Sequence, residues 1–396
     1  MERRFILLLA CLPMLLFAGS CIYDYTPVVE ASTSTVVIEG DILVGGYTDV
    51  RLSLTRPLDT EFSEMSQNEW PEDARAWVES SSGARYEGVG SRIDTRSADP
   101  SLEYRLHVYY KGRTYVSEWT PVVRSAEIDS VSYTISDDRM NLTVEVSSHG
   151  GADNVYYRWT AKEDWEYHTP NNASHYFIPA YTYDHGKLYE NSTIVPFQNG
   201  ENTYYCWDSG RVRDLLIAST EPLSENRLIR HPLFALSCYD QRISFIYSLE
   251  LTQEALSETA YRYWETMKRN SGDVGGLFSP EPFEMRGNIV NLEDPDEAVV
   301  GYISATVPEI RRIFINSEQI GFARIPASDR EVYNITPLHS QKKEWNKLYT
   351  SGYAVFVHTE NGKPDEFDWL PRRCVDCRVW GRGTKNKPEY WPNDHK

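Results

Sequence analysis

The chain has 396 residues and a formal net charge of −18, with 40 Lys and Arg against 58 Asp and Glu. This acidity argues against a nucleic-acid-binding protein, because such binding depends on basic side chains that neutralise phosphates. It argues equally against a polypeptide held on anionic lipid by charge. The 27 Tyr and 11 Trp, with few long apolar runs, are typical of a β-rich protein outside the cytoplasm, and the length favours two or three domains.

Residues 1–20 predict a lipoprotein signal peptide. Two arginines make a positive start, an apolar run follows over residues 5–17, and small residues precede Cys21. The apolar run is too short to remain as a membrane span. We therefore expect the thiol of Cys21 to be acylated, so that this cysteine becomes the N-terminus and its lipid chains anchor the protein to a membrane. Residues 21–34 then form a tether.

Two other interpretations of this segment are open. Leu8-Leu9-Ala10-Cys11 also has the residues of a lipid-attachment site, but cleavage there leaves almost no apolar region. An ordinary secretory signal cut near Ser20 would leave Cys21 as a free thiol, which is unfavourable outside the cell. Both therefore rank below acylation of Cys21.

Residues 35–125 predict an immunoglobulin-like β-sandwich. Alternation of polar and apolar residues is clearest in Val50-Arg51-Leu52-Ser53-Leu54-Thr55. Lys111-Gly112-Arg113 is typical of a short hairpin turn between two strands. Several short strands with no helix signal favour such a sandwich. Strands are expected at residues 35–42, 49–55, 74–79, 104–110 and 114–119, with an inserted loop at 56–72.

Residues 126–396 predict a larger β-rich domain that carries one amphipathic helix at about 252–270, so the fold class is mainly β. Thr252 can cap this helix, and Gly272 can end it. Apolar positions recur at three- and four-residue spacing, which predicts one buried face: Leu256, Ala260, Trp264 and Met267. Residues 168–205 are irregular, polar and aromatic, and we expect an exposed loop insertion. Strands are expected at residues 131–135, 141–146, 155–161, 215–219, 242–249, 288–291, 299–306, 312–315 and 353–358.

Aromatic residues of the larger domain are candidate ligand contacts. Loops at the ends of a sandwich are where binding residues usually lie, and an aromatic ring offers a large apolar face. Packing in the core explains the same residues equally well, and both interpretations stay open. The candidates are Trp159, Trp165, Tyr167, Tyr181 and Trp207.

Four cysteines follow the N-terminal segment: Cys206, Cys238, Cys374 and Cys377. An even number in an oxidising compartment favours structural disulfides. One pairing joins Cys374 to Cys377 and Cys206 to Cys238; another cross-links the tail to the 206–238 region. A zinc site ranks second. The four cysteines form one close pair and two distant single residues, whereas the common zinc site uses two close pairs. Redox catalysis by the C-x-x-C pair ranks third, since the βαβ context of that motif is missing.

Motifs of known chemistry are missing from the sequence. It has no His-Glu-x-x-His, no Gly-x-Ser-x-Gly, no phosphate loop and no dinucleotide fingerprint. The acidic residues 293–297 lack the spacing of a calcium loop, so a solvated turn is favoured. We therefore predict no catalytic residue, no metal and no cofactor.

Short blocks in a fixed order resemble a known family. The chain is similar, from about Val36 to Pro392, to the Bacteroidota outer-membrane lipoproteins of domain of unknown function family forty-two forty-nine. Ile38-Glu39-Gly40-Asp41 departs slightly from it, where many relatives have valine, glutamate, glycine and tryptophan. The blocks include Tyr263-Trp264-Glu265, Gly276-Leu277-Phe278, Pro280-Glu281-Pro282, Gly287-Asn288-Ile289, Asp294-Pro295-Asp296-Glu297, Gly301-Tyr302-Ile303-Ser304-Ala305, Cys374-Val375-Asp376-Cys377-Arg378 and Pro388-Glu389-Tyr390-Trp391-Pro392.

The resemblance implies an outer-membrane lipoprotein, often encoded beside a TonB-dependent transporter, with no catalytic residues to carry over. The favoured hypothesis is a binding or accessory component that works with such a transporter in nutrient capture. The alternatives are a cell-surface hydrolase acting on glycans or peptides, and a structural or adhesion lipoprotein. An enzyme is the less favoured interpretation. Surface export in such bacteria uses acidic residues after the lipid cysteine; Ile22-Tyr23-Asp24-Tyr25 supplies one, so the periplasmic and surface faces both stay open.

Overall fold

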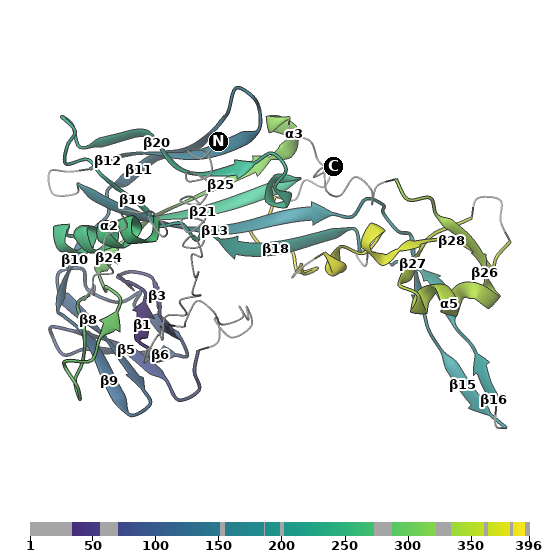
Figure 1. The fold of residues 1–396 in the computed structure, drawn as a ribbon, viewed down its shortest axis with the longest axis horizontal. Coiled ribbons are helices and arrows are strands. Elements are labelled where there is room, and N and C mark those ends of the chain that lie inside the picture. The colour runs from purple at the N-terminus through teal and green to yellow at the C-terminus, as the bar shows by residue number, and fades with distance from the viewer. Residues whose placement is uncertain are drawn as a thin grey trace, which may run out of the picture.

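The computed structural model describes residues 34–55, 70–150, 155–185, 187–198, 202–272, 287–321, 334–359, 363–380 and 383–392. The predicted signal peptide, Cys21 and the tether to residue 33 lie outside the described residues. The fold is mainly β, as the sequence predicts. Figure 1 shows three parts: an N-terminal body, a central sandwich and an arm that extends from the sandwich.

The N-terminal body is made of short paired strands around one core. One sheet follows the order β2 (Ile42–Leu43), β24 (Ala305–Val307), β10 (Thr120–Arg124), β8 (Glu103–Tyr110), β5 (Arg75–Ser80), β6 (Arg85–Val89), β7 (Arg92–Asp94) and β3 (Tyr47–Asp49). β9 (Arg113–Ser117) pairs with β8 and with β22 (Ile289–Asn291), and a further sheet has the order β23 (Val299–Val300), β1 (Val36–Glu39) and β4 (Arg51–Leu54). Alternate residues point into the shared core, among them Ile38, Val78, Tyr104 and Leu106.

Three strands of this body come from late in the chain. Val36 and Val37 pair in parallel with Val299 and Val300, and β24 lies between β2 and β10. The sequence-based division into 35–125 and 126–396 assigns these strands to the larger domain. The physical reason for the difference is that parallel partners lie far apart in sequence, so local alternation indicates a strand without indicating its partner.

The central sandwich packs two antiparallel sheets face to face. One has the order β11 (Glu127–Ile135), β12 (Asn141–His149) and β20 (Arg227–Ser237). The other has the order β18 (Tyr205–Arg211), β13 (Tyr156–His168), β21 (Ile246–Ala255) and β25 (Glu309–Asn316), and β19 (Leu216–Ser219) also pairs with β13. Their inner faces form one core that includes Leu142, Val144, Trp159, Leu249 and Leu251.

The predicted helix begins later than the sequence indicates. α2 runs over Glu258–Gly272, whereas residues 252–255 are the end of β21. Thr252 is no helix cap, because it pairs with Thr160 and Ile310 inside a sheet. Ser257 takes the capping role, since its hydroxyl accepts from the backbone N–H of Ala260 at 3.2 Å. The aromatic face of α2 packs on the sandwich, as expected, with Tyr261 stacked on Tyr156 at 4.8 Å.

The arm is folded, where the sequence predicted a loop insertion over 168–205. Its strands β14 (His175–Ile178) and β17 (Thr193–Pro196) pair, and β15 (Tyr181–Asp184) and β16 (Lys187–Glu190) form a hairpin that projects beyond it (Figure 1). A third sheet has the order β26 (Leu338–Gln341), β28 (Glu366–Pro371) and β27 (Tyr353–His358), with α5 (Trp345–Thr350) beside it. Phe177 from the first segment and Trp345, Phe367 and Trp369 from the second share one core. The remaining short helices of the described residues are η2 (Gln241–Ile243), α3 (Ser317–Ile320), η4 (Lys342–Glu344), η5 (Arg372–Cys374) and η6 (Cys377–Val379).

Candidate functional site

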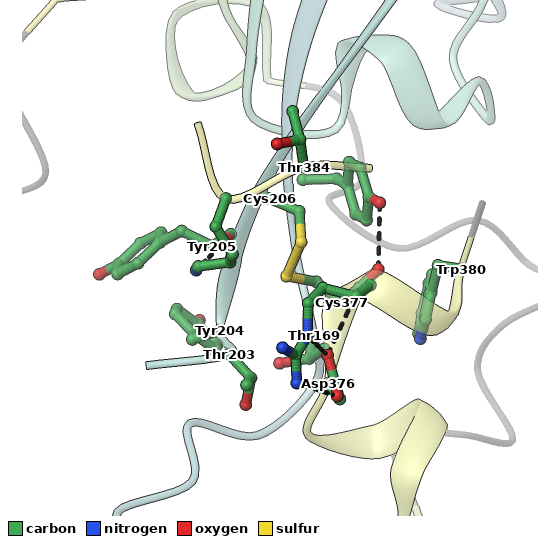
Figure 2. The surroundings of a disulfide bond; sticks show 12 residues. Thr169, Thr203, Tyr204, Tyr205, Cys206, Asp376, Cys377, Trp380 and Thr384 are labelled. Atoms are coloured by element: carbon green, nitrogen blue, oxygen red, sulfur yellow. Dashed lines mark hydrogen bonds and ion pairs between the residues drawn. A yellow bond between two sulfur atoms is a disulfide. The ribbon is translucent and has the colours of Figure 1, made fainter. Parts of the chain in front are cut away.

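A disulfide joins the arm to the central sandwich. Cys206 of β18 and Cys377 of η6 are bonded, with their Cα atoms 5.7 Å apart and a sequence separation of 171. Figure 2 shows the bond beside Thr203, Asp376 and Trp380. The backbone N–H of Cys377 donates to the carbonyl of Thr203 at 3.0 Å, and the hydroxyl of Tyr167 donates to the carbonyl of Cys377 at 3.0 Å. This fixes the base of the arm on two strands of the sandwich.

The pairing agrees in part with the predicted cross-links between the tail and the 206–238 region, because Cys206 is bonded to Cys377 but Cys238 and Cys374 form no second bond. The alternative bridge from Cys374 to Cys377 is wrong, and so is a bond from Cys206 to Cys238, because Cys238 and Cys374 are free and buried. Cys374 packs in the core of the arm with Leu370, whereas Cys377 packs beside Tyr167 and Cys206. The two cysteines of the C-x-x-C run thus face different cores. Burial raises the pKa of the Cys374 thiol, which disfavours the reactive thiolate.

Residues 383–392 lie along β18 and β13 and close over the junction. Thr384 and Trp207 exchange backbone hydrogen bonds of 2.9 and 2.7 Å. The Tyr390 hydroxyl donates to Asp164 at 2.6 Å, and the indole N–H of Trp391 donates to Glu166 at 2.8 Å. Three side-chain and backbone anchors therefore hold this segment to the sheet.

Glu166, a buried carboxylate where the arm meets the sandwich, has a structural role. Glu166 is 1 % exposed; it accepts from Trp391 and also pairs with His168. The ring of His168 stacks on Phe245 with centroids 3.6 Å apart. A carboxylate that is enclosed and already bound by two donors is poorly placed for proton transfer to a substrate. The arrangement anchors the tail.

The predicted aromatic contacts fall into two groups. Trp159, Tyr167 and Trp207 are 2, 2 and 6 % exposed, and Trp165 packs against the core of Trp159 and against that of Tyr167. For the three buried rings the core interpretation is right, and ligand contact is wrong, because their faces are covered by protein. Tyr181 is 51 % exposed on β15, so it alone presents most of its side chain to solvent.

A buried ion cluster joins the N-terminal body to the sandwich. Arg158 of β13 pairs with Glu254 of β21 and with Asp41, which follows β1, and all three side chains are 7 % exposed or less. Asp41 also accepts from the backbone N–H of Ser304 at 2.9 Å. Burial makes this pairing obligatory, because a lone buried charge is very unfavourable. No sequence spacing indicated the cluster, since 117 residues separate Asp41 from Arg158.

A cavity of about 280 Å³ lies at the edge of the sandwich, between the β18–β19 connection and β20. Arg242, on the short helix η2, is fixed beside it by Glu163 at 2.8 Å and Asp240 at 2.7 Å. Tyr247 completes this network by donating to Glu163 at 2.6 Å. Sequence reasoning missed the cavity entirely. The residues that line it are Arg211, Val212, Arg213, Asp214, Phe234, Ala235, Leu236 and Arg242.

Other kinds of site are not formed by the part of the chain that the structure describes. There, no three His, Cys, Asp or Glu side chains are grouped so that they could hold a metal. A four-cysteine zinc site is wrong in any case, because two of its members are bonded to each other. Among the described helices, none combines the length and the apolar character needed to cross a membrane.

Comparison with known proteins gives one family. The family described as domain of unknown function (DUF4249) matches residues 22–310, which is most of the chain. No curated protein matches it.

Proposed function

The chain belongs to the DUF4249 family, and for it we propose the role of a lipid-anchored binding or accessory protein of the outer membrane. In this proposal Cys21 carries the lipid, and the described body works with a TonB-dependent transporter in nutrient capture. The acidic net charge of −18 supports attachment through lipid, since such a chain is repelled by anionic headgroups.

The observation that carries the proposal is the arm. It extends from the sandwich and ends in the β15–β16 hairpin (Figure 1). Two segments distant in sequence build it around the shared core of Phe177 and Trp369, and the disulfide fixes its base. A small folded unit held rigidly away from the body is suited to contact a partner, because little conformational entropy is lost on binding.

The surface of the arm is suited to such a contact. Ile178 is 39 % exposed, Tyr181 51 % and Leu338 44 %. Large apolar and aromatic side chains that face solvent are the usual anchors of protein interfaces. The proposed docking element is therefore the arm face around β14 and β15, and the proposed partner is the transporter.

A pull-down from native outer membranes in mild detergent tests this role. The tagged full-length protein is expected to recover a TonB-dependent transporter in near-stoichiometric amount, identified by mass spectrometry. The double variant I178S/Y181S should recover much less. A matched control, I229S/Y239S, also replaces an exposed isoleucine and an exposed tyrosine, but on the sandwich, and should recover the wild-type amount.

Two results would overturn the proposal. One is recovery of the protein alone, at wild-type yield and in several detergents. The other is equal transporter recovery by both double variants, which would remove the arm from the interface. The anchor is tested separately, because C21S should move the protein from the membrane fraction to the soluble fraction.

A further inference from the structure

The cavity at the sandwich edge is lined by three arginines in a strongly acidic protein. Arg211 ends β18, Arg213 follows in the connection to β19, and Arg242 comes from η2. Asp214 is the single carboxylate of the lining. Arg242 is neutralised by Glu163 and Asp240, so the positive charge left in the lining is that of Arg211 and Arg213 against Asp214, in a chain that carries −18.

Two of these arginines have no direct partner among the described residues. Within the described residues, no hydrogen bond or ion pair engages the guanidinium of Arg211 or Arg213. Arg51 of β4 adds a like charge close to Arg211, and Asp49 offsets it in part. Burial, and after it the charge of Arg51, lowers the pKa of Arg211. The negative charge near its protonated guanidinium is therefore too small to balance it.

The third arginine is already oriented. Arg242 donates through Nε and Nη2 to Asp240 and through Nη1 to Glu163, which holds the plane of its guanidinium. Tyr247 supports Glu163 from within the core by donating to its carboxylate at 2.6 Å. A preorganised guanidinium loses little entropy when it binds a further oxygen.

The remaining wall is apolar. Val212 and Phe234 border the same cavity, whereas Leu236 is 1 % exposed and belongs to the core beneath it. Pockets for small ligands combine such walls with a few polar groups that fix orientation. The volume of about 280 Å³ suits a ligand no larger than a monosaccharide.

We propose that this cavity binds a small organic carboxylate, with the carboxylate between the guanidinium groups of Arg211 and Arg213 and the body of the ligand against Val212 and Phe234. Guanidinium and carboxylate match in geometry and can form two parallel hydrogen bonds. The proposal goes beyond the transporter role and does not depend on it, since it concerns residues of the central sandwich and not the arm, and a different class of ligand.

Isothermal titration calorimetry on the purified protein tests the proposal with two carboxylates, glucuronate and benzoate, and their neutral counterparts, glucose and benzyl alcohol. We expect at least one carboxylate to bind saturably, with a dissociation constant of about 1 mM or below. Its neutral counterpart should bind at least about ten-fold more weakly. Raising the salt concentration from about 0.1 M to about 1 M should weaken the binding, because the attraction is screened.

The variant R211Q/R213Q should bind the carboxylate at least about ten-fold more weakly. Neither guanidinium is paired with another described residue, so the fold should be retained, as a thermal unfolding curve would verify. R75Q/R227Q, which changes two exposed arginines elsewhere, should bind as the wild type does. Arg242 is left unchanged, because its removal would leave Glu163 buried without a partner.

The proposal is overturned if neither carboxylate binds saturably, if the neutral counterpart binds equally well, or if R211Q/R213Q binds like the wild type. A failure of the transporter pull-down would leave these titrations unaffected, so the two proposals can fail separately.

Discussion

Arg158 donates from Nε to Oε2 of Glu254 across 2.9 Å, and both side chains are buried. The same guanidinium reaches Asp41, which in turn accepts from the backbone of Ser304. One arginine of the sandwich thereby holds two segments of the N-terminal body, which lie more than 250 residues apart in sequence. This buried cation is one of several contacts between the two parts, beside the hydrogen bond from the backbone N–H of Gly301 to the hydroxyl of Tyr263 on α2.

Replacing this cation should destabilise the protein strongly. In R158M, Asp41 and Glu254 would be left buried without compensation, so we expect the free energy of unfolding to fall by about 3–5 kcal/mol. Urea denaturation followed by tryptophan fluorescence measures this change. R262M is the control, because Arg262 pairs with Glu221 and Glu265 at the surface with 47 % of its side chain exposed. Its effect should stay within about 1 kcal/mol; equal losses in both variants would contradict the assignment.

The disulfide should contribute to stability and should be found in one pairing. Because it closes a loop of 171 residues, C206S should lower the free energy of unfolding by about 2–5 kcal/mol. Non-reducing peptide mapping by mass spectrometry should recover Cys206 linked to Cys377. C374S should leave that linked peptide intact. A peptide bridged from Cys374 to Cys377 in the wild-type protein would refute the pairing.

Gly301 should tolerate no side chain. Its φ is +141°, and a Cβ there would lie 2.0 Å from the carbonyl oxygen of Ile38 on the neighbouring strand. G301A must therefore separate β23 from β1 or shift both. Gly45 is the matched control, because its φ of +87° is also positive but a Cβ would meet nothing within 4 Å. G45A should cost about 1–2 kcal/mol for the backbone conformation alone, and G301A clearly more in the same urea assay.

Lys385 should make stability depend on pH above neutrality. Burial lowers the pKa of this amine from 10.5 to about 8. Between these two values the unfolded chain binds more protons at this position than the folded one, so stability from this group rises with pH. K385M lacks the titration. The free energy of unfolding of K385M minus that of the wild type should be constant below pH 8 and should fall as the pH rises towards 10.5.

The other groups that titrate in this pH range are present in both proteins, so the difference in unfolding free energy between K385M and the wild type reports on Lys385 alone. Loss of the contact from Lys385 to the carbonyl of Tyr205 shifts the whole curve without changing its slope. If the difference in unfolding free energy between K385M and the wild type stays constant from pH 8 to 10.5, the pKa of the Lys385 amine is not lowered in the folded protein.

Local patterns predicted the elements that depend on neighbouring residues. The hairpin turn at Lys111 and Gly112 is present, with φ of 49° and 79°, because two successive residues with positive φ suit the twist of paired strands. Strand β5 covers nearly the predicted residues 74–79. The helix was found with the wrong beginning, because residues 252–255 fit a helical repeat as well as a strand, and only pairing with Arg158 and its neighbours on β13 favours the strand.

The sequence by itself determined the mainly β class and the aromatic face of α2, because these follow from residue type and from spacing along one segment; lipid attachment at Cys21 stays a prediction. Only the tertiary structure decided which strands pair, which cysteine Cys206 meets, and that Arg211, Arg213 and Arg242 share a cavity. Each of these joins residues from separate segments, and in the disulfide the partners lie 171 residues apart. The physical reason is that local periodicity encodes which face of an element is buried, whereas partner choice depends on how all the buried faces pack together at once.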